Sequence, residues 1–404
     1  MFMKNVYVGM SGGVDSSVSA LLLQEQGYKV VGVYMKNWSR DLPGMKCPWA
    51  EDLADAKRVA VKLGINFEVW DFENEYREKV VEYMLDEFRK GNTPNPDIIC
   101  NQEIKFKLFY EKAMAAGADY IATGHYARVK DGKLLRAVDE NKDQTYFLYR
   151  ISDEALAHTI FPIGEMTKPE VKKLADEKGL HNAYKKESMG VCFVGDVGMK
   201  DFLKEYIDVK PGEIREAESD KVLGYHEGAV FYTIGQRHGL YLDGEKGVIN
   251  DGLPYYVVKK DVDQNIVYVS KNLNHEAIWT KELMLKDIFM RTKSTFSSAG
   301  LEFSSTSYTG APGEPSLRDE PLGRGRNIRV ENPNQEMLQK KQILVRLRHR
   351  APLIPAIFDG DTLHFESEIR RPASGQSAVL YDGEVCFGGG IIEQQNTSTS
   401  KWRY

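Results

Sequence analysis

The chain has 404 residues, of which 42% are hydrophobic and 28% are charged, so a disordered or fibrous protein is excluded. At about 150 residues per domain, this length predicts two to three domains. The formal net charge of −5 excludes a uniformly basic nucleic-acid coat, although one domain can still carry a basic stripe.

Strands and helices alternate through the first third of the chain. This alternation predicts a doubly wound parallel α/β sheet, in which ligands bind at the carboxyl ends of the strands. The turns at 9–15 and 124–128 and the segment near Met35 lie at such ends. The expected strands are 4–10, 29–35, 65–72 and 118–124, and the expected helices end at Gly27, Gly64, about residue 90 and Gly117.

The pattern changes near residue 211, where short alternating strands separated by turns indicate small β domains. We predict domains at 1–210, 211–277 and 278–404. The stretch 293–338 is rich in Ser, Gly and Pro, and we interpret it as an irregular insertion in the last domain.

Four cysteines are too few for a disulfide-stapled scaffold. The first residues contain no apolar segment typical of a signal peptide, and the apolar runs are too short to span a bilayer. We therefore expect a cytoplasmic protein with no membrane partner.

A glycine-rich turn, GMSGGVDSS at 9–17, connects the first strand to the first helix. Gly12 and Gly13 let the backbone approach a ligand closely, and the turn amides at the helix N-terminus favour an anion. No lysine follows the glycines, so the turn is neither a Walker A loop nor GxGxxG. It resembles the pyrophosphate loop of the N-type ATP pyrophosphatase superfamily. Asp15 either caps the helix or helps to hold Mg²⁺.

Two cysteine segments stand out. Residues 91–106 contain two X-Pro bonds that stiffen the loop presenting Asp97 and Cys100, before a helix expected from Asn101. A thiol near a helix N-terminus has a lowered pKa. Cys192 follows Lys185 and Lys186 and is flanked by glycines. Each cysteine alone is typical of a buried apolar residue. Together with an adenylating loop, one thiol can carry persulfide sulfur and the other can release it by forming a disulfide.

Five segments occur in an order that is specific in combination: TPNPDIICNQEIKF (93–106), ATGHYAR (122–128), DQTYFLY (143–149), ESMGVCF (187–193) and YTIGQRHGL (232–240). With them the chain resembles the tRNA-specific 2-thiouridylases over almost its whole length, except at 293–338. The resemblance implies a pyrophosphatase-type α/β domain, a small central domain and a C-terminal β-barrel. It also implies thiolation of C2 of the tRNA wobble uridine, with ATP, Mg²⁺ bound together with ATP, and a persulfide from a cysteine desulfurase or sulfur-relay protein.

The resemblance also assigns roles to individual residues. It implies Cys192 as persulfide carrier, Cys100 as the attacking thiol and Asp97 as general acid or base. The remaining residues form two groups: the ATP-binding set Gly9, Met10, Ser11, Gly12, Gly13, Val14, Asp15, Ser16, Met35 and Gly124, and the tRNA-binding set Asn95, Pro96, Asp97, His125, Lys142, Asp143, Gln144 and Gln376. We expect a monomer.

Further residues have simpler interpretations. Arg346, Arg348 and Arg350 alternate on one expected strand face around His349, and we interpret Arg348 and His349 as RNA phosphate contacts. No cysteine or histidine is spaced for a metal site, so Cys47 is interpreted as structural or incidental. Cys386 lies in an alternating strand and is interpreted as a core residue.

Two other functions fit parts of the sequence. An ATP-dependent amide or amidine synthetase of the same superfamily would share the loop but need neither Cys100 nor Cys192. A non-catalytic, redox-sensitive RNA-binding protein would use the cysteines as a regulatory disulfide, but would not need the complete loop.

Overall fold

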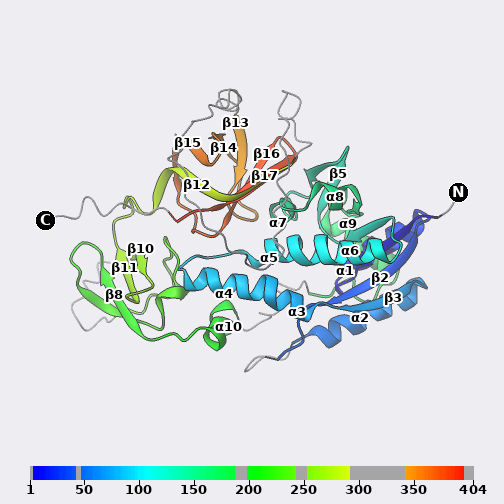
Figure 1. Ribbon diagram of the computed structural model, residues 1–404, viewed down its shortest axis with the longest axis horizontal. Helices are drawn as coiled ribbons and strands as arrows, with labels where there is room; N and C mark the ends of the chain where they lie inside the picture. Colours follow the sequence, from blue (N-terminus) through cyan, green and yellow to red (C-terminus); the bar gives the residue numbers. More distant parts are fainter. Residues whose placement is uncertain (1–2, 42–46, 187–197, 243–252, 292–341, 395–404) are drawn as a thin grey trace, which may run out of the picture.

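A computed structural model describes residues 3–41, 47–186, 198–242, 253–291 and 342–394. The described chain forms three sheets, and two long helical stretches run between them (Figure 1). The expected insertion at 293–338 and Cys192 lie outside the described residues.

The first sheet is parallel throughout and has the order β3-β2-β1-β4-β7. Its strands match the four expected from the sequence within a few residues, and β7 adds a short fifth. They are β1 (Asn5–Gly9), β2 (Lys29–Lys36), β3 (Asn66–Asp71), β4 (Tyr120–Thr123) and β7 (Thr159–Ile160). The predicted doubly wound α/β architecture is confirmed.

Helices cover both faces of this sheet because successive side chains of each strand point to opposite sides. Val6 and Val8 pack with α1 (Val14–Glu25), α2 (Trp49–Leu63) and α9 (Lys168–Glu177). Tyr7 packs on the other face, against two helical stretches. These are α3 (Glu73–Tyr76), η1 (Arg77–Val81) and α4 (Glu82–Arg89), followed by α5 (Pro96–Ile99), η2 (Cys100–Leu108) and α6 (Phe109–Ala115).

The second sheet has the order β10-β11-β8-β9 and its own apolar core around Val257 and Val267. Helix α10 (Met199–Tyr206) precedes it in the chain. Its elements are β8 (Gly212–Glu216), β9 (Val222–His226), η3 (Ala229–Phe231), β10 (Tyr256–Asp261) and β11 (Ile266–Ser270).

The third sheet closes on itself, because β12 pairs with both β15 and β17. The expected C-terminal β-barrel is confirmed, and within the described chain it is built from six strands. They are β12 (Trp279–Met290), β13 (Gln342–Arg346), β14 (Ile354–Phe358), β15 (Thr362–Arg370), β16 (Ser377–Asp382) and β17 (Val385–Ile392).

The barrel is joined directly to the first domain. The hairpin β5 (Ala127–Lys130) and β6 (Lys133–Arg136) extends the barrel sheet, since β6 pairs with β17. It is followed by α7 (Thr145–Leu148) and α8 (Asp153–Ala157). Asp143, 1% exposed, accepts a 2.5 Å hydrogen bond from Arg346 of β13, which is 4% exposed. A buried ion pair therefore joins the two domains.

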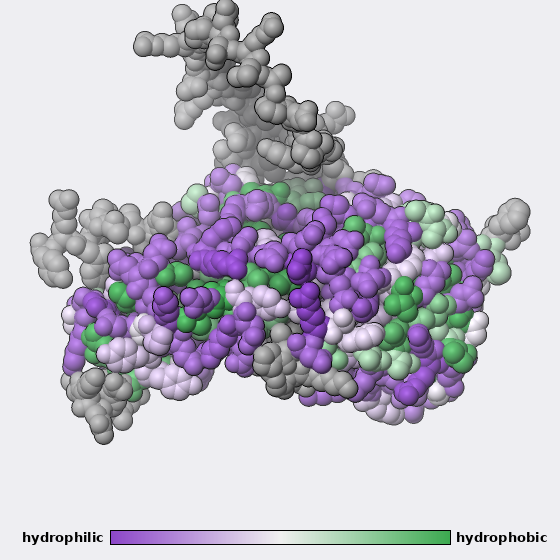
Figure 2. All heavy atoms as spheres, turned by 60° about the horizontal axis from the view of Figure 1, so that its bottom comes forward, coloured by the Kyte–Doolittle hydropathy of each residue, from purple (hydrophilic) through white to green (hydrophobic). Residues whose placement is uncertain are grey.

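The face of the molecule in Figure 2 is mostly hydrophilic, with apolar side chains in small groups. Within the described residues, no helix combines the length and apolar character needed to cross a bilayer.

We predict that Arg346→Met lowers the free energy of unfolding by about 3–5 kcal/mol, because the buried Asp143 carboxylate loses its nearest cation and Arg136 lies farther away, at 3.5 Å. Urea unfolding followed by circular dichroism measures the change. Arg89→Met is the matched control, since its pair with Asp86 is largely exposed and is worth less than about 1 kcal/mol. Equal losses in the two variants would contradict the prediction.

Candidate active site

The glycine-rich turn lies where three neighbouring strands end. A Cβ on Gly9, the last residue of β1, would lie 2.9 Å from the Met35 side chain of β2 and 3.8 Å from Thr123 of β4. A Cβ on Gly124 would lie 2.6 Å from the backbone nitrogen of Ser16. The structure thus brings together Gly9, Met35 and Gly124, as the sequence predicts.

The turn presents backbone to solvent at Ser11 and Gly13, whereas Met10, Val14 and Ser16 are buried. Ser16 Oγ accepts a hydrogen bond from the Ser11 amide at 3.2 Å and donates to the Gly13 carbonyl at 3.0 Å. These bonds hold the turn open at the N-terminus of α1. Such a geometry favours an anionic ligand.

Asp15 is paired inside the protein. Lys168 Nζ lies 2.7 and 2.8 Å from its two carboxylate oxygens, and the Tyr126 hydroxyl donates to it at 3.0 Å. Lys168 is 7% exposed and is the first residue of α9. A cation, which the sequence interpretation had missed, therefore stands beside the turn.

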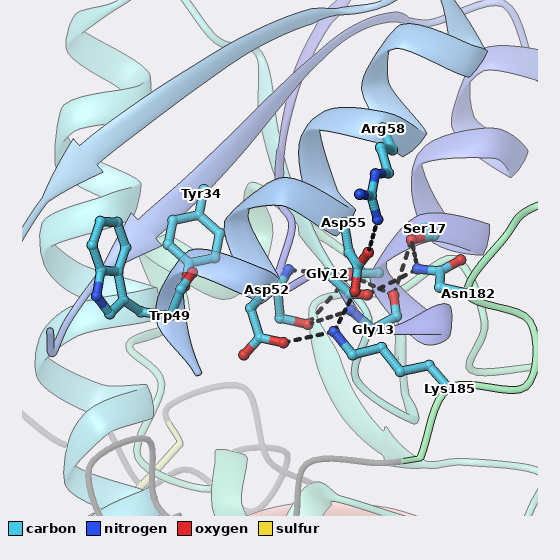
Figure 3. A network of polar contacts seen from close by, with 12 residues as sticks. Gly12, Gly13, Ser17, Tyr34, Trp49, Asp52, Asp55, Arg58, Asn182 and Lys185 are labelled. Atoms are coloured by element: carbon cyan, nitrogen blue, oxygen red, sulfur yellow. Dashed lines mark hydrogen bonds and ion pairs between the residues drawn. The ribbon is translucent and has the colours of Figure 1, made fainter. Parts of the chain in front are cut away.

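A second polar network holds the outer side of the turn (Figure 3). Asn182 donates to the Gly12 carbonyl and to the Ser17 hydroxyl, both at 2.9 Å. Lys185 pairs with Asp52 at 2.7 Å and Asp55 at 2.6 Å, so two carboxylates offset the charge of one of the two lysines that precede Cys192. Cys192 itself is not among the described residues.

The segment that carries Asp97 and Cys100 differs from the sequence expectation. The helix begins at Pro96 rather than near Asn101, with Asn95 as its N-cap in extended conformation. Prolines are favourable in the first turn, which explains the earlier start. Asp97 consequently occupies the first turn, whereas Cys100 lies in the second and is 4% exposed. Since a helix N-terminus acts mainly over its first turn, the predicted reason for Cys100 activation is wrong.

Asp97 is partly buried, and the desolvation of its carboxyl raises its pKa above the ordinary value, opposed by the charge of Lys105. Asp97 thus retains a proton more readily than an exposed aspartate. This property suits a group that takes up and returns a proton during a reaction.

His125 is 9% exposed and neutral at neutral pH, because burial, with help from Lys105, lowers its pKa well below the usual range. Its Nδ1 is 2.7 Å from the Thr123 hydroxyl, and its ring packs against Phe106 and Phe161. Contact with tRNA through His125 stays a prediction.

Other residues predicted to contact tRNA make internal bonds. Asp143 is in the ion pair described above, and Gln144 Oε1 accepts from the Tyr126 amide at 2.9 Å. Gln376 donates to the Thr93 carbonyl at 2.7 Å. Lys142 donates its amide to the Asp139 carbonyl. Their contacts with RNA stay predictions, but each of these residues also stabilises the protein itself.

The arginine pattern at 346–350 was interpreted incorrectly. Strand β13 ends at Arg346, so Arg348 and Arg350 lie in the following turn rather than on one strand face. Arg346 is buried, whereas Arg348 is exposed. The His349 ring packs on Phe147 at 4.6 Å, and burial together with Arg350 and Arg346 lowers its pKa to about 4. Within this group Arg348 and Arg350 are both exposed, and Arg350 Nε also donates to the Asn141 carbonyl at 3.1 Å.

The other cysteines are buried. Cys386 lies on β17 and is 0% exposed, and burial raises its pKa to about 12. Cys47 is 5% exposed, and burial likewise raises its pKa. The interpretation of Cys386 as a core residue is confirmed. The described residues contain no cluster of three or more side chains suited to a metal ion.

Comparison with protein-family models gives three matches that follow one another along the chain. Residues 4–196 match the tRNA methyl transferase HUP domain, 200–271 the tRNA methyl transferase PRC-barrel domain, and 326–392 the aminomethyltransferase beta-barrel domain.

Curated relatives match over nearly the full length. A tRNA-specific 2-thiouridylase MnmA from Idiomarina loihiensis is 43% identical over 98% of this chain and 97% of that protein. The proteins of the same name from Lysinibacillus sphaericus and Listeria monocytogenes are 41% and 42% identical. They cover 99% and 96% of this chain, and 96% and 94% of their own lengths.

We predict that Asp97→Asn raises the thermal midpoint at pH 7.5. The pKa of Asp97 is higher in the folded protein than in the unfolded protein, so the folded protein loses stability as the pH rises and Asp97 ionises. Asparagine carries no charge at this position and avoids that loss. The gain should shrink as the pH falls toward the ordinary aspartate pKa of 3.8. Differential scanning fluorimetry from pH 5 to 8 measures the difference in thermal midpoint. Asp86→Asn, at an exposed position, is the control. A lower midpoint for Asp97→Asn at pH 7.5 would show that burial does not oppose its ionisation.

Proposed function

Because the chain belongs to the tRNA-specific 2-thiouridylase family, we propose that it replaces O2 of the wobble uridine in tRNA by sulfur, at the expense of ATP. The observation that carries this proposal is the open turn at the N-terminus of α1, whose backbone contacts require glycine at 12 and 124. Two further observations support it: the raised pKa of Asp97, and a relationship that spans 98% of the chain. The three-domain division at 210/211 and 277/278 is part of the proposal.

ATP would bind with its phosphates over Ser11 and Gly13 and its nucleoside along the strand ends at Gly9, Met35 and Gly124. Backbone amides of the turn would hold the phosphates. Mg²⁺ would enter with ATP, since the phosphates supply oxygen ligands and Asp15 is the carboxylate of the turn. Lys168, which forms an ion pair with Asp15, would remain close enough to offset the charge of the phosphates.

The target base would lie against Asn95, Pro96 and Asp97. Unstacking a base from the anticodon loop costs a few kcal/mol, so a stiff backbone that receives it is an advantage. When uracil O2 attacks the α-phosphorus and pyrophosphate leaves, the N3 proton must also leave. Asp97, with its raised pKa, is suited to accept this proton and to return it afterwards.

Sulfur would then replace the adenylated oxygen. The terminal sulfur of a Cys192 persulfide adds to C2, and AMP departs with the former O2. Cys100 attacks Cys192 Sγ, which breaks the bond to the transferred sulfur and forms a Cys100–Cys192 disulfide. A cellular thiol reductant restores both thiols. An equivalent route releases hydrosulfide from Cys192 first. The partners are tRNA and a protein persulfide donor, in the cytoplasm.

We predict that Cys192→Ser abolishes thiolation while ATP binding stays within about twofold of wild type, because the variant loses the sulfur carrier alone. The assay incubates unmodified tRNA with ATP, Mg²⁺ and a persulfide donor, and nucleoside mass spectrometry detects exchange of oxygen for sulfur. Cys47→Ser, outside the proposed chemistry, is the control and should thiolate normally. Normal thiolation by Cys192→Ser would remove the carrier role. Release of pyrophosphate without RNA and without a thiolated nucleoside would favour the synthetase alternative.

We predict that Asp15→Ala and Lys168→Gln each slow pyrophosphate release by roughly 10-fold to 100-fold, because a charge-assisted hydrogen bond contributes about 1.5–3 kcal/mol. Lys173→Gln is the matched control on the same helix, since the Lys173 side chain is 77% exposed. Release at the wild-type rate in Asp15→Ala would exclude Asp15 from the nucleotide site.

A further inference from the structure

The segment between α4 and α5 lies between the second sheet and the barrel (Figure 1). A Cβ on Gly91, which has φ of +80°, would lie 2.9 Å from Val262 next to β10. On the barrel side, a Cβ on Gly375, which has φ of +88°, would lie 3.1 Å from the backbone nitrogen of Thr93. Both positions require glycine, so the backbone contacts on either side are close.

Thr93 is fastened to the barrel through its own backbone. Its amide donates to the Ser374 carbonyl at 2.8 Å, and its carbonyl accepts from Gln376 Nε2 at 2.7 Å. Its hydroxyl is 3.3 Å from that of Thr233 in the central domain. All polar groups of this residue thus have partners in other domains.

The Gln376 amide nitrogen is occupied by this segment. In addition to Thr93, it lies 3.4 Å from the Pro94 carbonyl, so this nitrogen contacts two consecutive carbonyls of the segment. The predicted contact with RNA would then use Oε1, as an acceptor. Gln376 is therefore able to hold the segment and contact RNA at the same time.

The backbone between Thr93 and Asp97 has little conformational freedom, so the position of Thr93 largely determines that of Asp97. Proline fixes φ at 94 and 96, and the residues before them are restricted to extended backbone. Asn95 has φ of −113° and ψ of 93°, as this restriction requires, and the helix with Asp97 and Cys100 begins directly afterwards.

We propose that Gln376 is a positioning residue, which holds the Thr93 carbonyl so that Asp97 and Cys100 stand in place for the reaction. The barrel turn that carries Gln376 thereby sets the geometry of the chemistry in the first domain. The kinetic part of this inference rests on the proposed thiolation, whereas the position of the segment can be tested without catalysis.

The test measures the rate at which iodoacetamide alkylates Cys100 without tRNA or ATP, resolved by peptide mass spectrometry. Cys100 is 4% exposed, so its labelling reports loosening of the segment. Gln376→Met keeps the side-chain length but loses the donor, and we expect at least fivefold faster labelling. Gln376→Lys keeps an N–H donor and loses the acceptor, so its labelling should stay within twofold of wild type. Exposed Gln264→Met is the control.

Kinetics provide the second measurement. For Gln376→Met we expect kcat for thiolation to fall at least tenfold, with KM for tRNA within threefold of wild type.

Labelling of Gln376→Met at the wild-type rate, or equal labelling of the Met and Lys variants, overturns the inference. A change in KM alone would also overturn it, since Gln376 would then serve only as an RNA contact. Gln376→Asn, whose donor is one methylene short, should behave like the Met variant and replaces it if that variant does not fold. If Gln376→Met is labelled faster but the wild-type protein does not thiolate tRNA, the proposed function is rejected and the positioning role of Gln376 is retained.

Discussion

The structure depends on a close approach of backbone to backbone at the ends of β1 and β4. A side chain on Gly12 would overlap the carbonyl oxygen of Asp52, and one on Gly124 would overlap the first turn of α1. This contact places the end of β4 directly under the helix N-terminus. The turn can take this position at the N-terminus of α1, where an anion is favoured, only because neither Gly12 nor Gly124 carries a side chain.

Charge around this turn is balanced before any ligand arrives. Asp15, Asp52 and Asp55 would together repel a polyphosphate, yet Lys168 pairs with the first and Lys185 with the other two. Lys168 comes from α9 and Lys185 from the chain beyond it, so a segment distant in sequence neutralises the carboxylates. A substrate phosphate then meets paired charges, and the backbone dipoles of the turn determine the local preference for an anion.

The first domain and the barrel do not behave as independent units. The core that holds Trp70 and Phe109 of the first domain continues to Val379 and Tyr381 of the barrel, and β6 extends the barrel sheet. Buried Arg291 at the end of the barrel donates to carbonyls at 148, 149 and 151. Because apolar and polar contacts both cross the boundary, the barrel can determine where segments of the first domain lie.

The sequence predicted what depends on local pattern. Strand and helix periodicity gave the parallel sheet, and the glycine turn and its neighbours Met35 and Gly124 meet as expected. It did not predict Lys168 beside Asp15, because 153 residues separate them and a lysine at a helix start resembles any solvated charge. Arg346 fits an alternating strand pattern, although it pairs with Asp143 from another domain. Gln376 is the clearest example. Its partner is a backbone carbonyl, and every residue has one, so the sequence does not indicate which carbonyl this side chain contacts. Contacts of this kind can be recognised only after the chain has folded, and they are the ones that join the sheets around Asp97 and Cys100.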